Sequence, residues 1–361
     1  MTDRINTNYK SLLAVVRNIL KEPGQDRNLL FRLLGDTIYT PNSSAIFSQK
    51  ESLFDTLFDL GWIEERDGFV HPLKWISRVG LCDGEVFILR DIPSSRLSRK
   101  NSNYEWSDET SDFFECFGEA EIRDRKYGSE LLDLCTGSGS LAVCSRKINQ
   151  GLKVVASDLN NQSKLDVQIN DFLNDADNCE IDCVVGNLWE PVESKRFDLI
   201  LTVPPFSLSP QGEVVSRQFS GGEFGDSVTS EVILNCHRFL KNEESKIQML
   251  VYTLGNSDGS YTRLHKLFEE QKSVEFQIIP LPSKKVWRFK HSKAFTNGMP
   301  VEYMISRLGD PFKEEFFDSR SRTAMNADLD RLEKYELWIS RLKREGWTNL
   351  WYCGVIGTLK T

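Results

Sequence analysis

The strongest constraint on the fold is a short apolar segment that runs into a glycine-rich turn and then into a helix. Residues 131–135 read Leu-Leu-Asp-Leu-Cys, and residues 136–142 continue Thr-Gly-Ser-Gly-Ser-Leu-Ala. Gly137 and Gly139 allow the backbone to approach a ligand where a Cβ would intrude. The third glycine of the dinucleotide fingerprint is absent. The segment therefore predicts the start of a ligand-binding α/β sheet, with a tight connection that binds nothing as the alternative.

Strand-like and helix-like segments alternate from residue 130 onward. This alternation predicts an α/β fold in which helices cover both faces of a parallel sheet. The expected strands are 130–135, 152–157, 181–188, 197–203, 246–254 and a final 350–359, and the expected helices are 139–149, 161–175, 227–241 and 260–272.

The first part of the chain has a different pattern. Helical spacing is followed by a predicted hairpin and a strand, in the segments 9–20, 26–34, 51–60, 62–70 and 84–90. This order predicts a small N-terminal α+β domain of winged-helix type over 1–93. A polar, basic stretch over 94–103 is the expected linker, and 104–361 is the expected main domain.

Charge and cysteine content limit the functional class. The 361 residues carry a formal charge of -8, so the molecule as a whole repels nucleic acid. The eight cysteines are scattered and form no C-x-x-C pair, and no apolar signal follows Met1. No apolar run is long enough to cross a membrane. We expect a cytoplasmic protein with reduced cysteines, no metal site and no membrane segment.

Polar side chains end the next two strands at the same predicted sheet edge. Asp158 lies nineteen residues after Gly139, where a carboxylate can accept two hydrogen bonds from a ribose diol. A helix cap is the alternative role for Asp158. Asn187 ends the third strand, where a short polar side chain can bind the amine of an adenine.

The fourth strand runs into two prolines and an aromatic residue. Pro204 and Pro205 cannot donate to a strand ladder, so the strand must stop and leave its last carbonyls free. Free carbonyls and Phe206 would then rim a pocket. An ordinary strand stopped by proline is the alternative.

Taken in order and spacing, these motifs resemble class I S-adenosylmethionine-dependent methyltransferases. The branch they resemble carries an (Asn/Asp)-Pro-Pro-aromatic motif and contains release-factor glutamine methyltransferases and small-domain RNA guanine methyltransferases. The resemblance implies a Rossmann-like fold, S-adenosyl-L-methionine as cofactor, and methyl transfer by direct in-line displacement. It assigns cofactor binding to Thr110, Asp133, Cys135, Thr136, Gly137, Gly139, Asp158, Leu159, Asn187, Leu188 and Thr202, and acceptor binding to Val203, Pro204, Pro205 and Phe206.

The sequence departs from that branch at two positions. Val203 replaces the Asn or Asp that accepts hydrogen bonds from a planar amide or amine, and Cys135 replaces a common glycine. Because cysteine is small, the second change should be mild. The first favours a small-molecule acceptor, which includes natural products, methylated on nitrogen or oxygen. The alternatives are a protein glutamine or RNA acceptor, and a non-catalytic cofactor-binding protein that acts through interactions.

A basic stretch after the fifth strand of the sheet is a candidate substrate lid. Residues 284–293 hold five cationic residues, two aromatics and no acid, within a predicted insert around 281–300. His291 lies in this stretch and is a candidate general base, with His237 as a weaker one. A solvated basic loop is the alternative. The oligomeric state and the role of the N-terminal domain stay open at this stage.

Overall fold

A computed structural model describes residues 7–34, 51–66, 69–91, 109–174, 180–206, 208, 210–211, 220–281, 298–301 and 324–360. These residues form two compact units, which are described one at a time. Of the described residues, unit one contains those up to Asp91, Glu109–Ser111 and Glu119–Pro191, and unit two contains Asp112–Gly118 and those from Val192 onward. The predicted linker 94–103 and the turn at 67–68 lie outside the described residues.

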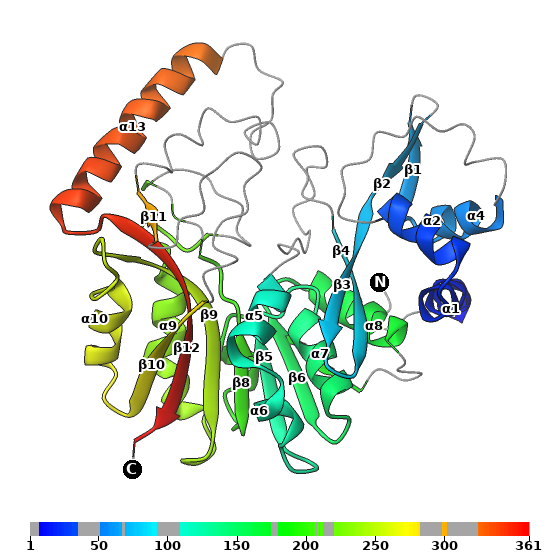
Figure 1. Cartoon of the computed structure of the whole chain (residues 1–361), viewed down its shortest axis with the longest axis horizontal. Coiled ribbons are helices and arrows are strands. Elements are labelled where there is room, and N and C mark those ends of the chain that lie inside the picture. Colours follow the sequence, from blue (N-terminus) through cyan, green and yellow to red (C-terminus); the bar gives the residue numbers. More distant parts are fainter. Residues whose placement is uncertain are drawn as a thin grey trace. The chain divides into compact units, whose positions relative to one another are not determined.

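Unit one begins with helices followed by two antiparallel hairpins (Figure 1). The elements are α1 (Thr7–Lys21), α2 (Gln25–Leu34), α4 (Glu51–Asp59), β1 (Ile63–Arg66), β2 (Phe69–Pro72), β3 (Lys74–Leu81) and β4 (Gly84–Asp91). Strand β1 pairs with β2, and β3 pairs with β4. The predicted helices, the hairpin and the strand over 84–90 are confirmed. A winged-helix domain over 1–93 stays a prediction.

The second half of unit one is a parallel βαβαβ arrangement. It consists of β5 (Glu130–Leu134), α7 (Ser140–Ile148), β6 (Lys153–Asp158), α8 (Gln162–Leu173) and β7 (Asp182–Val185), preceded by α6 (Ala120–Arg123). Strand β6 pairs in parallel with β5 on one side and β7 on the other. Parallel strands end at one edge, so this arrangement gathers the residues after β5, β6 and β7 there.

One hydrophobic core joins the two halves of unit one. Ile169, Phe172 and Leu173 of α8 are buried in the same cluster as Leu13 and other apolar residues of α1, α2, α4 and the hairpins. The amphipathic spacing of α1 explains this packing, because its buried residues lie on one face. The N-terminal elements are thus packed against the helix that follows β6.

Unit two holds a mixed sheet with flanking helices. Its elements are η1 (Glu190–Val192, at the boundary), β8 (Leu199–Thr202), α9 (Ser227–Asn235), η2 (Cys236–Arg238), β9 (Lys246–Gly255), α10 (Arg263–Glu270), β10 (Val274–Pro280), β11 (Met299–Pro300), α13 (Ala324–Arg344) and β12 (Asn349–Leu359). Helix α5 (Glu109–Phe117) begins in unit one and continues in unit two.

The expectation of a wholly parallel sheet is wrong in unit two. Strands β8 and β9 are parallel, but β12 lies between β9 and β10 and is antiparallel to both. The residue types that predicted residues 350–359 as a strand carry no information about strand direction. The result is an α/β, Rossmann-like fold with a mixed sheet and flanking helices.

Candidate functional site

The glycine-rich turn after β5 has an unusual backbone. Cys135, Gly137 and Gly139 all have positive φ, at 62°, 56° and 87°. A Cβ on Gly139 would lie 2.6 Å from Cγ2 of Val167, so glycine is required for α8 to pack against the turn. Cys135 adopts the left-handed region with a side chain, which costs free energy that glycine would avoid. The turn is therefore tighter and more strained than the sequence suggested.

Asp133 holds this turn from inside the protein. Its side chain is 1 % exposed, and Oδ2 accepts hydrogen bonds from Thr136 Oγ1 at 2.5 Å and from the Ala142 amide at 3.0 Å. Thr136 also donates its amide hydrogen to the Ser157 carbonyl of β6. These bonds fix the path from β5 into α7, so the contribution of Asp133 and Thr136 to any ligand is through the shape of the turn.

Asp158 lies beside the turn, as the chain order predicted. Its Oδ2 accepts the Gly137 amide hydrogen at 2.8 Å, and its Oδ1 accepts the Asn160 amide hydrogen at 2.8 Å. Burial raises the pKa of this carboxyl, against the lowering effect of the backbone amides. A carboxylate with free lone pairs at the end of a parallel strand can accept hydroxyl hydrogen bonds from a ribose.

Apolar side chains are exposed next to Asp158. Leu159 follows it and is 50 % exposed, and Val185 of β7 pairs with it in register and is 42 % exposed. Asn187 is exposed as well, and Leu188 has a positive φ of 47°. An apolar surface beside a carboxylate fits a base attached to a ribose, which supports a nucleoside ligand at this edge of unit one.

Thr110, at the start of α5, also contacts the region of the turn. Its hydroxyl donates a 2.8 Å hydrogen bond to Ser140 Oγ, at the first residue of α7, and both side chains are buried. The predicted cofactor residues of unit one, from Thr110 to Leu188, therefore lie on the elements around the ends of β5, β6 and β7. Their binding roles stay predictions.

In unit two, the predicted acceptor segment follows β8. Thr202 is fully buried, and its Oγ1 has no hydrogen-bond partner within the described part of the chain. Val203, Pro205 and Phe206 are half-buried, and Pro204 is buried. An unsatisfied buried hydroxyl at a strand end is uncommon.

An aromatic stack that the sequence did not reveal supports Phe206. Its ring centroid lies 4.0 Å from that of Tyr252 on β9, and Tyr252 stacks on Tyr352 of β12 at 4.1 Å. The Tyr352 hydroxyl donates to Asp112 at 3.3 Å. Tyr252 and Tyr352 are register partners on adjacent strands, a pairing that only the strand order reveals. One face of Phe206 is thus occupied within the protein.

A second loop packs against the Pro-Pro-Phe segment. A Cβ on Gly225 would lie 2.7 Å from the Phe206 carbonyl oxygen, and Gly225 has a positive φ of 75°. Arg263 of α10 fixes this loop, since its guanidinium lies 3.9 Å from the Phe224 ring centre and its Nε is 2.5 Å from Asp226 Oδ2. Arg341 of α13 pairs with Glu223 in the same loop.

Of the two candidate bases, His237 is the one that lies within the described residues. His291 and nearly all of the predicted lid over 281–300 lie outside the described residues. His237 lies in η2, where its Nδ1 is 3.0 Å from Gln271 Nε2. His237 is thus engaged in packing between α9 and α10.

Three further findings hold for the described ranges of the chain. They contain no group of three or more His, Cys, Asp or Glu side chains suited to a metal. None of their helices combines the length and apolar character that a membrane crossing requires. Of the eight cysteines, seven lie within these ranges, and none of the seven forms a disulfide there.

Comparison with known proteins supports the class indicated by the site. Residues 115–222 match the family model of the methyltransferase small domain. A release factor glutamine methyltransferase from Thermodesulfovibrio yellowstonii is 27% identical over 124 residues, which are 32% of this chain and 44% of that protein. The chain thus matches less than half the length of this curated relative.

Solved structures of methyltransferases are also similar. A ribosomal protein L11 methylase from Lactobacillus delbrueckii subsp. bulgaricus is 20% identical, with a TM-score of 0.34 over 48% of this chain and 72% of that one. A phosphoethanolamine N-methyltransferase 2 from Haemonchus contortus, in complex with S-adenosyl-L-methionine, is 12% identical, with a TM-score of 0.36 over 86% and 74%. These scores are low, so the class rests on the sequence matches.

Residues 115–222 are similar to a methyltransferase domain, and the resemblance to class I methyltransferases noted from the motifs is confirmed. Within that class, the matched segment is of the methyltransferase small domain type, and S-adenosyl-L-methionine is the cofactor of the class.

Proposed function

We propose that the protein is an S-adenosylmethionine-dependent methyltransferase that methylates nitrogen or oxygen of a small-molecule acceptor. The observation that carries the proposal is the position of the Asp158 carboxylate, 2.8 Å from the Gly137 amide and beside exposed Leu159 and Val185. A carboxylate supported by a glycine turn and flanked by apolar surface fits the ribose and base of the cofactor. The buried, unpartnered Thr202 hydroxyl in unit two is a further polar group that suits a ligand.

The cofactor would supply a methyl group already activated by a positive sulfonium. The protein's task is then to orient the acceptor, exclude water and leave no competing nucleophile. The Val203 side chain cannot accept a hydrogen bond. The molecule to be methylated would therefore be bound by shape, by Phe206 and by the carbonyls of residues 203 and 204. A general base is needed only for a hydroxyl or protonated amine, and His291 is the candidate.

A protein acceptor is the second candidate. The matched relative is described as a release factor glutamine methyltransferase, and the L11 methylase carries the name of a ribosomal protein. An RNA acceptor is a weaker candidate because the chain is acidic. A non-catalytic role is weaker because Gly137, Gly139 and Asp158 are all present.

The test has two stages. Calorimetry with S-adenosylmethionine and S-adenosylhomocysteine should show binding, and Asp158→Ala should weaken it by about 1.5–3 kcal/mol. Transfer of tritiated methyl to an extract separated into small-molecule, protein and RNA fractions then identifies the acceptor. Label in the protein fraction alone would favour the second candidate, and binding without transfer would indicate a non-catalytic protein.

A further inference from the structure

Helix α8 carries a stripe of polar residues on a face that is buried. Asp166, Asn170 and Asn174 follow one another every fourth residue, which places them on one side of the helix and its C-cap. Asn170 is 0 % exposed and Asp166 is 2 % exposed. On sequence alone such residues would be assigned to a solvated face. Here they face the β3–β4 hairpin of the same unit.

The two asparagines cover the edge of β4 that β3 leaves free. The Leu89 amide donates to Asn170 Oδ1 at 2.7 Å, and Asn170 Nδ2 donates to the Leu89 carbonyl at 2.9 Å. Asn174 makes the same pair of bonds with Phe87, at 2.8 and 2.6 Å. Four helical residues rise about 6 Å and two strand residues about 6.6 Å, so the spacings match. The two side-chain amides act as a substitute strand.

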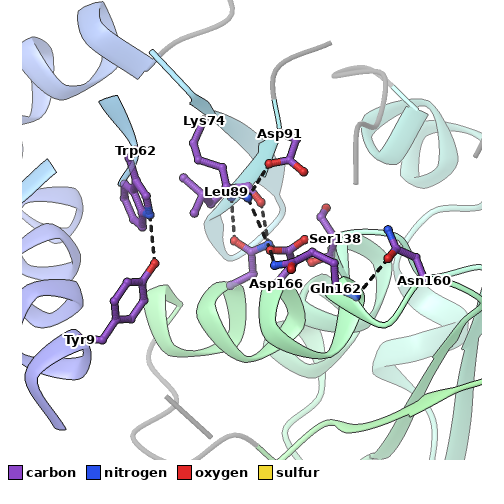
Figure 2. Close-up of polar contacts among 10 residues, drawn as sticks. Tyr9, Trp62, Lys74, Leu89, Asp91, Ser138, Asn160, Gln162 and Asp166 are labelled. Carbon is purple, nitrogen blue, oxygen red and sulfur yellow. Dashed lines mark hydrogen bonds and ion pairs between the residues drawn. The ribbon is translucent and has the colours of Figure 1, made fainter. Parts of the chain in front are cut away.

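A buried ion pair reinforces this contact one turn earlier on α8. Lys74 Nζ of β3 lies 2.6 Å from Asp91 Oδ1 and 3.6 Å from Asp166 Oδ1 (Figure 2). Burial opposes the charge on Lys74, yet the two carboxylates together raise its pKa. The hairpin is therefore fixed to α8 at three successive turns of the helix.

The two asparagines differ in the partner of their second Nδ2 hydrogen bond. Asn170 Nδ2 also donates to the Ser138 carbonyl at 2.9 Å, in the centre of the glycine-rich turn. Asn174 Nδ2 instead donates to the Asn170 carbonyl, within the helix. Asn170 thus joins Leu89 of the hairpin to Ser138 of the turn, and both of these residues are labelled in Figure 2.

We propose that Asn170 is a positioning residue for the cofactor turn, and that the β3–β4 hairpin influences cofactor affinity through it. The turn is bounded by two glycines with positive φ, so its backbone has little intrinsic preference for one shape. Asp133 fixes the residues on either side, and Asn170 fixes the Ser138 carbonyl between the glycines. The orientation of the backbone amides that would face the cofactor therefore depends on Asp133 and on Asn170. This inference rests on the proposed cofactor-binding function of the turn.

The experiment compares Asn170→Ala with Asn174→Ala in the full-length protein. Each change removes one pair of bonds to β4, so both should lower the melting temperature, but only Asn170→Ala frees the turn. We expect Asn170→Ala to weaken S-adenosylhomocysteine binding at least about tenfold, equivalent to about 1.4 kcal/mol, and Asn174→Ala to change it less than about threefold. Equal affinity changes in the two variants would overturn the proposal.

A measurement on the wild type covers the case in which Asn170→Ala does not fold. Coupling is reciprocal, so S-adenosylhomocysteine should slow hydrogen exchange in β4 as well as in residues 136–142. The β1–β2 hairpin is not among the partners of the Asn170 side chain, which are Leu89 and Ser138, and it should not change. Protection confined to the turn contradicts the role of Asn170. Failure of the wild type to bind at all overturns the proposed function itself, a result that is recognised before any variant is made.

Discussion

The carboxylate of Asp158 accepts the amide hydrogen of Gly137, which joins the end of β6 to the turn after β5. A second amide, from Asn160, bonds to the other oxygen. The carboxylate is thus held in one orientation by two backbone donors while its remaining lone pairs stay available. This arrangement links the shape of the turn to the protonation of one side chain.

Cofactor affinity should fall as the pH is lowered toward the raised pKa of Asp158. Burial lifts this pKa above its ordinary value of 3.8, so the carboxylate protonates at a higher pH in the folded protein. Protonation weakens acceptance of ribose hydrogen bonds. Calorimetry with S-adenosylhomocysteine across the acidic range should show this loss, and Asp158→Ala should remove it. A wild-type affinity independent of pH would contradict the ribose assignment.

The raised pKa of Asp158 has the opposite consequence for the free energy of unfolding. Because the folded pKa lies above the unfolded one, the contribution of Asp158 is most favourable below pH 3.8 and declines as pH rises through the folded pKa. Above that window it is constant. The free energy of unfolding of the wild type relative to Asp158→Asn, which does not titrate here, should therefore fall as the pH rises through the folded pKa, measured by urea denaturation at several pH values.

Gly139→Ala should destabilise the protein strongly. The new Cβ would meet Val167 at 2.6 Å and the residue would keep a φ of 87°, so overpacking adds to backbone strain. Gly128→Ala is the matched control, with a φ of 81° and no heavy atom within 4 Å of its Cβ. We expect a loss of about 1–2 kcal/mol for the control and about 1–3 kcal/mol more for Gly139→Ala. Equal losses would show that α8 does not constrain the turn.

Cys135→Gly should stabilise the fold. Its φ of 62° penalises any side chain, and the gain from removing Cβ exceeds the added entropy of glycine in the unfolded chain. The expected rise in the free energy of unfolding is about 0.5–1 kcal/mol. Cys135→Ala keeps the Cβ and should show no such gain. A loss of stability in Cys135→Gly would mean that the thiol contributes more by packing than its backbone costs.

Val203→Asn tests the acceptor class. A buried amide facing an acceptor that cannot satisfy it should cost about 1–3 kcal/mol, or roughly 5- to 150-fold in rate. Steady-state methyl transfer with the identified acceptor measures this. If the variant is equal or faster, the acceptor is a planar amide or amine, and the protein acceptor becomes the leading candidate.

Sequence reasoning succeeded where the signal is local. The strands and helices between 130 and 272 follow from alternating patterns, and the turn with Asp158 follows from residue types at strand ends. Strand direction is not local, so β10 and the antiparallel place of β12 were missed. Helix α13 was also missed, although its last three turns bury Tyr335, Trp338, Ile339 and Leu342.

The role of Asn170 was hidden for a different reason. A polar residue every fourth position in a helix is the usual pattern of a solvated face. Only the position of β4, 81 residues earlier in the chain, turns this face into a buried one. In the same way, the sequence shows only that a small residue, Cys135, replaces a glycine. The backbone strain at this position follows from its positive φ, which only the structure gives.

The pairing of β4 with α8 also bears on the order of synthesis. Leu89 and Phe87 leave the ribosome 81 and 87 residues before the asparagines that satisfy them. Until then the free edge of β4 must stay bonded to water, and the N-terminal apolar residues lack the part of their core that Ile169, Phe172 and Leu173 supply. Translation that pauses between β4 and α8 would hold the nascent chain in a form prone to pair with other chains.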